Sequence, residues 1–179
     1  MRIIAGKFKG KVLKEFELGS TRPTTDMVRE ALFDKIGFDV DGAVFLDLFA
    51  GTGAVGIEAL SRNAKFCFFV DAQKDAIKII NKNLELVGAR NFELKNLDFE
   101  TALLGFEKSS TKFDIVFLDP PYASDFAEKA IDAIMSKNLL SQNGLIVWEH
   151  DASKLEYIQQ NFADCKTKKY GKKYLTYIK

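Results

Sequence analysis

Short apolar runs alternate with segments of helical periodicity over most of the chain. Apolar runs bounded by turn residues predict strands, namely AVFLDLF (43–49), KFCFFVD (65–71), NFELKNLD (91–98), FDIVFLD (113–119) and GLIVWEH (144–150). Apolar residues at helical spacing predict helices between them, namely GAVGIEALSRN (53–63), AQKDAIKIINKNLELVG (72–88) and FAEKAIDAIMSKNLL (126–140). This alternation predicts an α/β fold, a Rossmann-like doubly wound sheet of mostly parallel strands.

The two ends of the chain show different patterns. RIIAGKF and GKVLKEF alternate polar and apolar residues around Gly10, which predicts a basic β-hairpin extension within residues 1–22. DMVREALFDKIG predicts a helix with Thr24 or Thr25 as its N-cap and Gly37 as its end. ASKLEYIQQNF (152–162) predicts a helix, CKTKKYGKKYLTYIK (165–179) predicts a hairpin turning at Gly171, and the stretch 101–108 is helical or irregular.

Composition narrows the class of protein. A chain of 179 residues that is 47% hydrophobic and 28% charged predicts one globular domain over residues 1–179, with monomer as the default state. No apolar run reaches about 18 residues, and the first residues lack the apolar core of a signal peptide. Cys67 and Cys165 have neither a CxxC pattern nor a neighbouring histidine, so we expect buried, reduced thiols, no metal site and a cytoplasmic protein.

Charge is segregated along the chain although the formal net charge is only +1. Residues 1–14 hold five basic side chains and residues 165–179 hold six, with no acid in either stretch. Such basic ends are typical of proteins that bind a polyanion. Lysine-rich edge hairpins kept in solution explain the same pattern equally well from charge alone.

Glycines follow the first core strand in a spacing typical of nucleoside sites. Gly51, Gly53 and Gly56 fit GxGxxG, and Asp71 ends the next strand. Glycines there admit the backbone approach of a ligand, and the acid accepts hydrogen bonds from ribose hydroxyls. A tight turn with close helix–strand packing is the alternative, and it leaves Asp71 unexplained.

Two further acids bear on which nucleoside binds. Asp47 stands close to the glycine loop, where an acid suits a cation such as the ammonium or sulfonium of S-adenosylmethionine better than a pyrophosphate. Asp98 could accept from an adenine amino group while Phe99 lies on the ring. Taken alone, Asp98 is better explained as an Asp turn or a helix N-cap.

FLDPPY (117–122) ends the fourth core strand with an acid, two prolines and a tyrosine. The Asp119 carboxylate and the Pro120 carbonyl can accept from both N–H groups of an amine conjugated to a ring, which turns the nitrogen lone pair toward a methyl donor. Asp119 could then take the proton, and Tyr122 would stack on the extruded base. The alternative is a proline-rich turn with no chemical role.

These motifs carry a family resemblance that spans nearly the whole chain. DLFAGTG, VD, NLD and DPPY resemble the amino-group class of S-adenosylmethionine-dependent methyltransferases. RIIAGKFKGKVL, RPTTDMVREALFDKI and LDLFAGTGAVGIEALSR further resemble the bacterial 16S rRNA guanine-N2 methyltransferases that modify guanine 966. The resemblance implies a class I methyltransferase fold with a seven-stranded sheet, S-adenosyl-L-methionine as cofactor, and a 16S rRNA guanine as substrate, in an assembled or assembling small ribosomal subunit.

The resemblance also assigns roles by position. The implied cofactor contacts are Asp47, Phe49, Ala50, Gly51, Thr52, Gly53, Gly56, Asp71, Ala72, Asp98 and Phe99. The implied catalytic motif is Asp119, Pro120, Pro121 and Tyr122. The family often has Glu where Asp71 stands, and either acid can accept from a ribose.

An enzyme acting on RNA needs phosphate contacts, and the basic ends supply candidates. These are Arg2, Lys7, Lys9, Lys11 and Arg22, with Lys172 and Lys173 as further candidates. Arg29 is expected to pair with an acid, and His150 to be structural, because no triad spacing supports it as a base.

Three other functions remain open from the sequence. An adenine-N6 methyltransferase would use the same DPPY motif, but the chain has little room for a domain that reads DNA sequence. A nicotinamide-dependent oxidoreductase would leave DPPY unused. A non-catalytic RNA-binding assembly factor would need the basic ends but not Asp119 with Tyr122.

Overall fold

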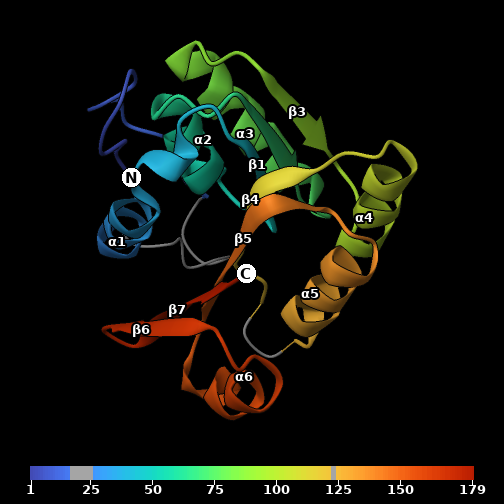
Figure 1. Ribbon diagram of the computed structural model, residues 1–179. Helices are drawn as coiled ribbons and strands as arrows, with labels where there is room; N and C mark the ends of the chain where they lie inside the picture. Colours follow the sequence, from blue (N-terminus) through green and yellow to red (C-terminus); the bar gives the residue numbers. More distant parts are fainter. Residues whose placement is uncertain (17–25, 122–123) are drawn as a thin grey trace.

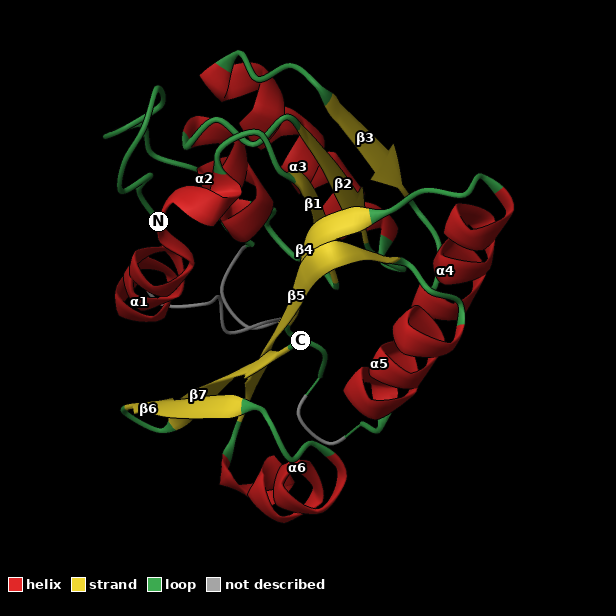
Figure 2. Cartoon of the chain, in the orientation of Figure 1, coloured by secondary structure: helices red, strands yellow, loops and turns green. Residues whose placement is uncertain are grey.

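A single seven-stranded sheet organises the protein, with helices on both of its faces (Figures 1 and 2). The computed structural model describes residues 1–16, 26–121 and 124–179. The strands lie in the order β3-β2-β1-β4-β5-β7-β6, and β7 runs antiparallel to both of its neighbours, β5 and β6, whereas the other pairs are parallel. The strands are β1 (Val44–Leu48), β2 (Phe66–Val70), β3 (Phe92–Lys95), β4 (Phe113–Leu118), β5 (Leu140–His150), β6 (Lys166–Tyr170) and β7 (Lys173–Ile178). The predicted α/β sheet of seven mostly parallel strands is thereby confirmed.

The helices cover the sheet in two layers because successive strand residues face opposite sides. Phe45 of β1 and Phe117 of β4 pack under α1, α2 and α3, whereas their neighbours Leu46 and Leu118 pack under α4, α5 and α6. The helices are α1 (Asp26–Ile36), α2 (Ala54–Ser61), α3 (Lys74–Val87), α4 (Phe99–Lys108), α5 (Phe126–Ser136) and α6 (Leu155–Asn161), with short 3-10 turns η1 (Gly37–Val40) and η2 (Ala152–Lys154).

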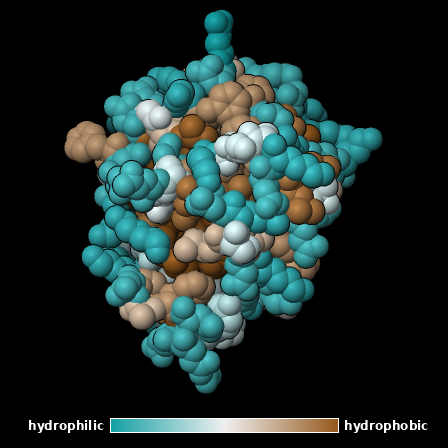
Figure 3. All heavy atoms as spheres, turned by 45° about the vertical axis from the view of Figure 1, so that its right-hand side comes forward, coloured by the Kyte–Doolittle hydropathy of each residue, from teal (hydrophilic) through white to brown (hydrophobic). Residues whose placement is uncertain are grey.

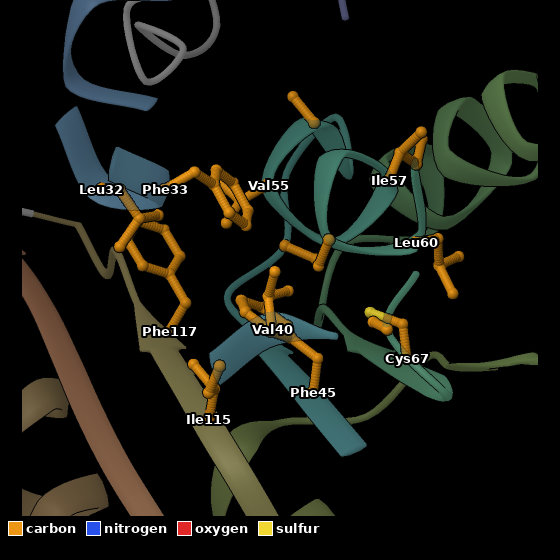
Figure 4. Close-up of a cluster of buried hydrophobic side chains, with 14 of the residues drawn as sticks. Leu32, Phe33, Val40, Phe45, Val55, Ile57, Leu60, Cys67, Ile115 and Phe117 are labelled. Carbon is orange, nitrogen blue, oxygen red and sulfur yellow. The ribbon is translucent and has the colours of Figure 1, made fainter. Parts of the chain in front are cut away.

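The first layer has a continuous apolar core. Val55 of α2 and Phe33 of α1 meet Phe45 and Phe117 from the sheet in one cluster of buried side chains (Figure 4). All of α2 is buried, as its apolar sequence requires, so this helix is fixed between the sheet and the elements outside it. That rigidity matters because the glycine loop leads directly into α2.

The outer surface is largely hydrophilic on the side that carries α4 and α5, with apolar atoms exposed between the polar side chains (Figure 3). In the part of the chain that the structure describes, no helix is long and apolar enough to cross a membrane.

Several predicted boundaries are confirmed. Gly37 follows the end of α1, Gly88 ends α3 with a left-handed φ of 70°, and Gly171 lies in the turn between β6 and β7. The uncertain stretch 101–108 is helical, as part of α4. The predicted N-caps Thr24 and Thr25 lie outside the described residues.

The predicted N-terminal hairpin is wrong as a strand pair. In the described residues 1–16, no strand forms, and Arg2 and Val12 make one isolated antiparallel bridge. Backbone hydrogen bonds do join the two arms, from Ile3 N–H to the Lys11 carbonyl at 3.0 Å and from Leu13 N–H to the Met1 carbonyl at 2.9 Å. The pairing does not extend into strands, because side chains of the domain take up other backbone groups of the segment: Glu58 accepts from Ile4 N–H and Ala5 N–H at 2.8 and 3.0 Å. The rest of the predicted extension lies outside the described residues.

Gly6 allows this docking. A Cβ on Gly6 would lie 1.9 Å from the Ser61 carbonyl oxygen, and its φ is +79°. Ser61 holds the segment on both sides of Gly6. Its Oγ donates to the Ala5 carbonyl at 2.5 Å and accepts from Phe8 N–H at 2.9 Å, and its carbonyl accepts from Lys7 N–H at 2.8 Å. Residues 1–16, called the N-terminal segment below, are therefore attached to α2 without forming a helix or a strand.

Candidate active site

A cleft of about 720 Å³ opens at the carboxyl ends of the central parallel strands. This is where ligands bind in doubly wound α/β folds. Twelve of the residues predicted for the cofactor and catalytic sites line it: Asp47, Phe49, Ala50, Gly51, Thr52, Asp71, Ala72, Asp98, Phe99, Asp119, Pro120 and Pro121. Tyr122 lies outside the described residues.

The loop after β1 is shaped by the end of β2. Phe49 and Ala50 both donate their backbone N–H to the Val70 carbonyl at 3.0 Å, and Phe49 has a left-handed φ of 73°. The backbone N–H of Gly51 donates to Asp71 Oδ2 at 2.9 Å, while Gln73 N–H donates to Asp71 Oδ1 at 2.8 Å. Burial raises the pKa of Asp71, and the N–H groups of Gln73 and Gly51 partly offset that rise.

Gly53 and Gly56 do not line the cleft. Gly53 precedes α2 with a φ of 75°, and a Cβ there would lie 3.0 Å from Ile80 Cγ2. A Cβ on Gly56 would lie 2.3 Å from Phe69 Cε1 and 2.7 Å from Cys67 Sγ. Gly56 therefore serves the close approach of α2 to the sheet, and Gly53 serves the close approach of the loop to Ile80 of α3. Both fit the structural alternative left open by the sequence.

Asp47 is buried at the base of the cleft. Its Oδ2 accepts from the backbone N–H of Gly56 at 2.9 Å. Burial raises the pKa of Asp47 to about 8, although the Gly56 N–H opposes the rise, and the charges of Asp119 and Asp71 raise it further. A buried carboxyl of this kind favours a cation beside it, because a cation stabilises the ionised form.

Asp98 is the N-cap of α4. Its carboxylate accepts from the backbone N–H and the hydroxyl of Thr101, both at 2.8 Å, and these bonds lower its pKa. The simpler interpretation of Asp98 as a helix cap is therefore confirmed. Asp98 also lines the cleft.

Three phenylalanine rings form an apolar wall in the cleft. Phe49 and Phe99 have ring centroids 5.5 Å apart, and Phe126 at the start of α5 lies 6.4 Å from Phe49 and 5.4 Å from Phe99. Phe49 and Phe126 are nearly parallel, with 12° between their planes. Such a wall can cover a flat, weakly polar ring.

The end of β4 brings Asp119 to the same cleft. β4 pairs with β1, so Leu118 lies beside Leu48, and the residues after both strands face one opening. Asp119 is half-buried, Pro120 is buried and Pro121 is exposed. A carboxylate and a rigid backbone turn therefore line the same cleft as the glycine loop.

Sequence reasoning missed several lining residues. Phe16 comes from the N-terminal segment, Gln73 and Leu97 come from loops after β2 and β3, and Phe126 comes from α5. Leu97 and Gln73 stand beside the predicted acids Asp98 and Asp71, and that adjacency was the available signal. Phe16 and Phe126 have no such signal.

The predicted RNA contacts differ in availability. Lys7 and Lys9 are exposed, and Arg22 lies outside the described residues. Arg2 is exposed, but its guanidinium donates to the Gly10 carbonyl at 2.7 Å. Lys11 is exposed as well, but its Nζ donates to the Val87 carbonyl at 3.0 Å at the end of α3.

The two C-terminal candidates for RNA contacts also differ in availability. Lys172 is exposed, whereas Lys173 pairs with the buried carboxylate of Glu149. Lys173 is therefore tied to an internal counter-charge, and Lys172 is the better placed of the two for a phosphate.

The ring of His150 is held inside the fold by two hydrogen bonds. His150 is buried, its ring nitrogens lie 2.7 Å from the Asp151 carbonyl and the Thr176 hydroxyl, and burial lowers its pKa. This is a structural histidine. Arg29 pairs with Asp26 at 3.0 Å and lies 3.8 Å from Glu58.

Both cysteines are free, and Cys67 is buried, but Cys165 is only half-buried, contrary to expectation. Across the described ranges, no cluster of His, Cys, Asp or Glu could hold a metal ion.

Comparisons with known proteins agree with this geometry. A family model described as conserved hypothetical protein 95 matches residues 1–179. YlbH of Bacillus subtilis, by its name a candidate rRNA methyltransferase, is 43% identical over 84% of this chain and 83% of its own length. The ribosomal RNA small subunit methyltransferase D of Haemophilus influenzae is 35% identical over 96% of this chain and 89% of its own length. The structure of a hypothetical protein of Thermus thermophilus covers 100% of this chain and 99% of its own, with a TM-score of 0.85 and 28% identity.

Proposed function

This chain belongs to the family described as conserved hypothetical protein 95, and on that premise we propose that it transfers a methyl group from S-adenosylmethionine to the exocyclic N2 amine of a guanine in small-subunit (16S) ribosomal RNA. Methyl transfer with S-adenosylmethionine as cofactor belongs to this family. Its relative in Haemophilus influenzae carries the small-subunit ribosomal RNA in its name. The guanine and its N2 amine are the proposed part.

One observation carries the proposal. Acids at the ends of three adjacent parallel strands, Asp47 of β1, Asp71 after β2 and Asp119 after β4, line one cleft together with Pro120. Sites for a nucleoside cofactor and for a polar planar group therefore share one space. An oxidoreductase would use only the first of these sites.

The residues of the cleft fit S-adenosylmethionine. Asp71 has acceptor capacity for ribose hydroxyls beyond its two backbone bonds. Asp47 supplies a carboxyl for the ammonium group, and the wall of Phe49, Phe99 and Phe126 suits an adenine ring. When bound, S-adenosylmethionine supplies a methyl group on a sulfonium centre.

Asp119 and Pro120 would then act on the guanine amine. The Asp119 carboxylate and the Pro120 carbonyl accept from the two N–H groups and draw the nitrogen out of conjugation with the ring. As the nitrogen–carbon bond forms and the carbon–sulfur bond breaks, positive charge develops on nitrogen, and the Asp119 carboxylate stabilises it. Asp119 then takes the surplus proton and passes it to water. Tyr122 is proposed to stack on the extruded base.

The N-terminal segment and the β6–β7 turn are proposed to contact RNA phosphates. Exposed Lys7, Lys9 and Lys172 are the main candidates, because Arg2, Lys11 and Lys173 have internal partners. Phosphate contacts of this kind position the RNA without reading its sequence.

The test is a methyl-transfer assay with labelled S-adenosylmethionine on deproteinised small-subunit RNA, partly assembled small subunits and duplex DNA. Each product is digested to nucleosides and identified by mass spectrometry. Asp119→Ala should abolish transfer, while Asp132→Ala, on the exposed side of α5, should leave it unchanged.

Label in N2-methylguanosine that depends on Asp119 is the expected result. Label in N6-methyladenine would refute the guanine assignment. RNA binding without any methyl transfer would mean that the protein is a non-catalytic assembly factor and not an enzyme. The ratio between the first two substrates shows which form of the RNA the basic residues recognise.

A further inference from the structure

One buried side chain holds both the N-terminal segment and the loop that lines the cleft. Asn83 lies on α3 and is fully buried. Its Oδ1 accepts from the backbone N–H of Lys14 at 2.7 Å, and its Nδ2 donates to the Lys14 carbonyl at 3.0 Å. The same Nδ2 donates to the Thr52 carbonyl at 3.0 Å. Two segments distant in sequence therefore share one amide.

Both segments held by Asn83 contribute to the cleft. Thr52 lies in the loop between β1 and α2 and lines the cleft. Lys14 stands two residues before Phe16, whose side chain lines the same cleft. Fixing the backbone at Lys14 therefore limits where Phe16 can lie. Fixing the Thr52 carbonyl limits the shape of the glycine loop between β1 and α2 (residues 49–53), which is called the cofactor loop below.

The pattern of donors and acceptors requires an amide at this position. A backbone N–H needs an acceptor, and two backbone carbonyls need donors, so only one orientation of the Asn83 amide satisfies all three groups. Aspartate has the same shape but no donor, and its carboxylate would face two carbonyl oxygens. Alanine would leave the buried Thr52 carbonyl without this partner.

Attachments elsewhere keep the segment docked independently of the cleft. Glu58 accepts from Ile4 and Ala5, and Ser61 accepts from Phe8. All of these contacts lie on α2. Asn83 is thus hydrogen-bonded both to the N-terminal segment, which is already attached to α2, and to the cofactor loop.

We propose that Asn83 is a positioning residue that couples the N-terminal segment to the cofactor loop. A ligand that orders the loop also orders the segment around Lys14 and Phe16. By reciprocity of binding free energies, RNA bound on the segment raises the affinity for the cofactor. The identity of these two ligands rests on the proposed function, whereas the coupling rests on the three hydrogen bonds of Asn83.

The first test uses the product of methyl transfer, S-adenosylhomocysteine, as the probe, so that no RNA is needed. Its dissociation constant is measured by isothermal titration calorimetry for the wild type, Asn83→Asp and the matched control Asn81→Asp. Asn81 is on the same helix, and its amide donates to Glu85 on the helix surface. We expect Asn83→Asp to weaken binding about tenfold, the change expected when the loop loses its one hydrogen bond from Asn83 to the Thr52 carbonyl. Asn81→Asp should bind as the wild type does.

The second test follows hydrogen exchange of the peptide covering residues 1–16 in the unaltered protein, with and without S-adenosylhomocysteine. Saturating ligand should slow exchange near Lys14 several-fold. In Asn83→Asp the ligand should still protect the β1–α2 loop but no longer the segment. This readout separates coupling from a general loss of stability.

Two results would overturn the coupling. The first is a dissociation constant for S-adenosylhomocysteine that is the same in Asn83→Asp as in the wild type. The second is a hydrogen-exchange rate of residues 1–16 that, in the wild type, does not change when the ligand is added. Because the second uses the unaltered protein, it decides the question even if Asn83→Asp does not fold. Failure of the wild type to bind S-adenosylhomocysteine would instead overturn the cofactor assignment. Binding with no RNA methylation would overturn only the proposed function, and the coupling would stand.

Discussion

The backbone N–H of Gly51 donates to Oδ2 of Asp71 at 2.9 Å, so the acid that ends β2 shapes the loop that follows β1. A carboxylate has about four acceptor positions, and the Gly51 and Gln73 N–H groups occupy two of them. Asp71 can therefore hold the loop and still accept from a ribose. This pairing explains how the acid after β2 fixes the loop after β1, while the left-handed φ of 55° at Gly51 is what favours glycine at that position.

Replacing Asp71 should weaken cofactor binding through both of these roles. Asp71→Ala leaves two backbone N–H groups without their partner and removes the proposed ribose acceptor, so the dissociation constant for S-adenosylhomocysteine should rise at least tenfold. Calorimetry measures this directly. Asp75→Ala is the control, because Asp75 is exposed in the first turn of α3 and pairs with Lys78. Equal affinities in the two variants would exclude Asp71 from the cofactor site.

Asp47 should make the ligand-free protein less stable as the pH rises. Its pKa is about 8 in the folded protein and near 3.8 in the unfolded chain. Between these values the folded state holds a proton that the unfolded state has lost, so the free energy of unfolding falls as the pH rises. The loss begins above the lower value and is complete above the higher one. Asp47→Asn removes this titration while its amide oxygen still accepts from Gly56.

The measurement is urea unfolding of the wild type and Asp47→Asn from pH 5 to pH 8.5. The variant should gain stability relative to the wild type by several kcal/mol over that range, and the gain should level off above the folded-state pKa. Asp34→Asn, at an exposed site on α1, should follow the wild type. Parallel curves for wild type and Asp47→Asn would mean that Asp47 ionises normally in the fold.

The sheet and the strand-end acids were predictable because they follow from local pattern and one topological rule. Apolar runs such as FDIVFLD fix the strands, and parallel strands bring their carboxyl ends to one edge. Asp47, Asp71 and Asp119 are therefore brought to one edge by the parallel sheet. The N-cap role of Asp98 was also open to prediction, because capping depends on only the next three residues.

Residues whose positions depend on the tertiary path were not predictable. Phe16 lines the cleft two residues after Lys14, whose backbone is bonded to Asn83 on a distant helix, and Phe126 lines it from α5, which packs beside α4. The predicted hairpin failed for the same reason. Alternation in residues 2–16 indicated strands, but Glu58 and Ser61 on a distant helix offered better partners for the backbone.

Gly56 should tolerate no side chain. A Cβ there would press on Phe69 and on the buried Sγ of Cys67, neither of which is free to move within the core. Gly56→Ala should therefore lower the free energy of unfolding by ~1–3 kcal/mol, as overpacked cores do.

The same substitution at Gly105 is the control. Gly105 lies within α4, and a Cβ added there would meet nothing within 4 Å, so alanine should stabilise the protein by ~0.5–1 kcal/mol through helix propensity. Urea unfolding of both variants should show shifts of opposite sign. A stabilised Gly56→Ala would mean that α2 can move away from the sheet, against the packing described above.

Glu58 should be the main electrostatic anchor of the N-terminal segment. It is fully buried, accepts from Ile4 and Ala5, and pairs with Arg62 at 2.9 Å. Arg29, also buried, lies 3.8 Å from it. Glu58→Gln removes the buried counter-charge of two arginines and one acceptor of the segment.

Breaking a buried pair on one side leaves an uncompensated charge, so Glu58→Gln should lower the free energy of unfolding by ~3–5 kcal/mol. Exchange of the Ile4 and Ala5 amides should accelerate more than exchange in the central strands, since the segment loses its partner first. Glu107→Gln is the matched control, because Glu107 makes an exposed pair with Lys137 and such pairs contribute ~1 kcal/mol or less. A Glu58→Gln protein as stable as this control would mean that apolar packing of Ile3, Phe8 and Leu13 alone holds the segment.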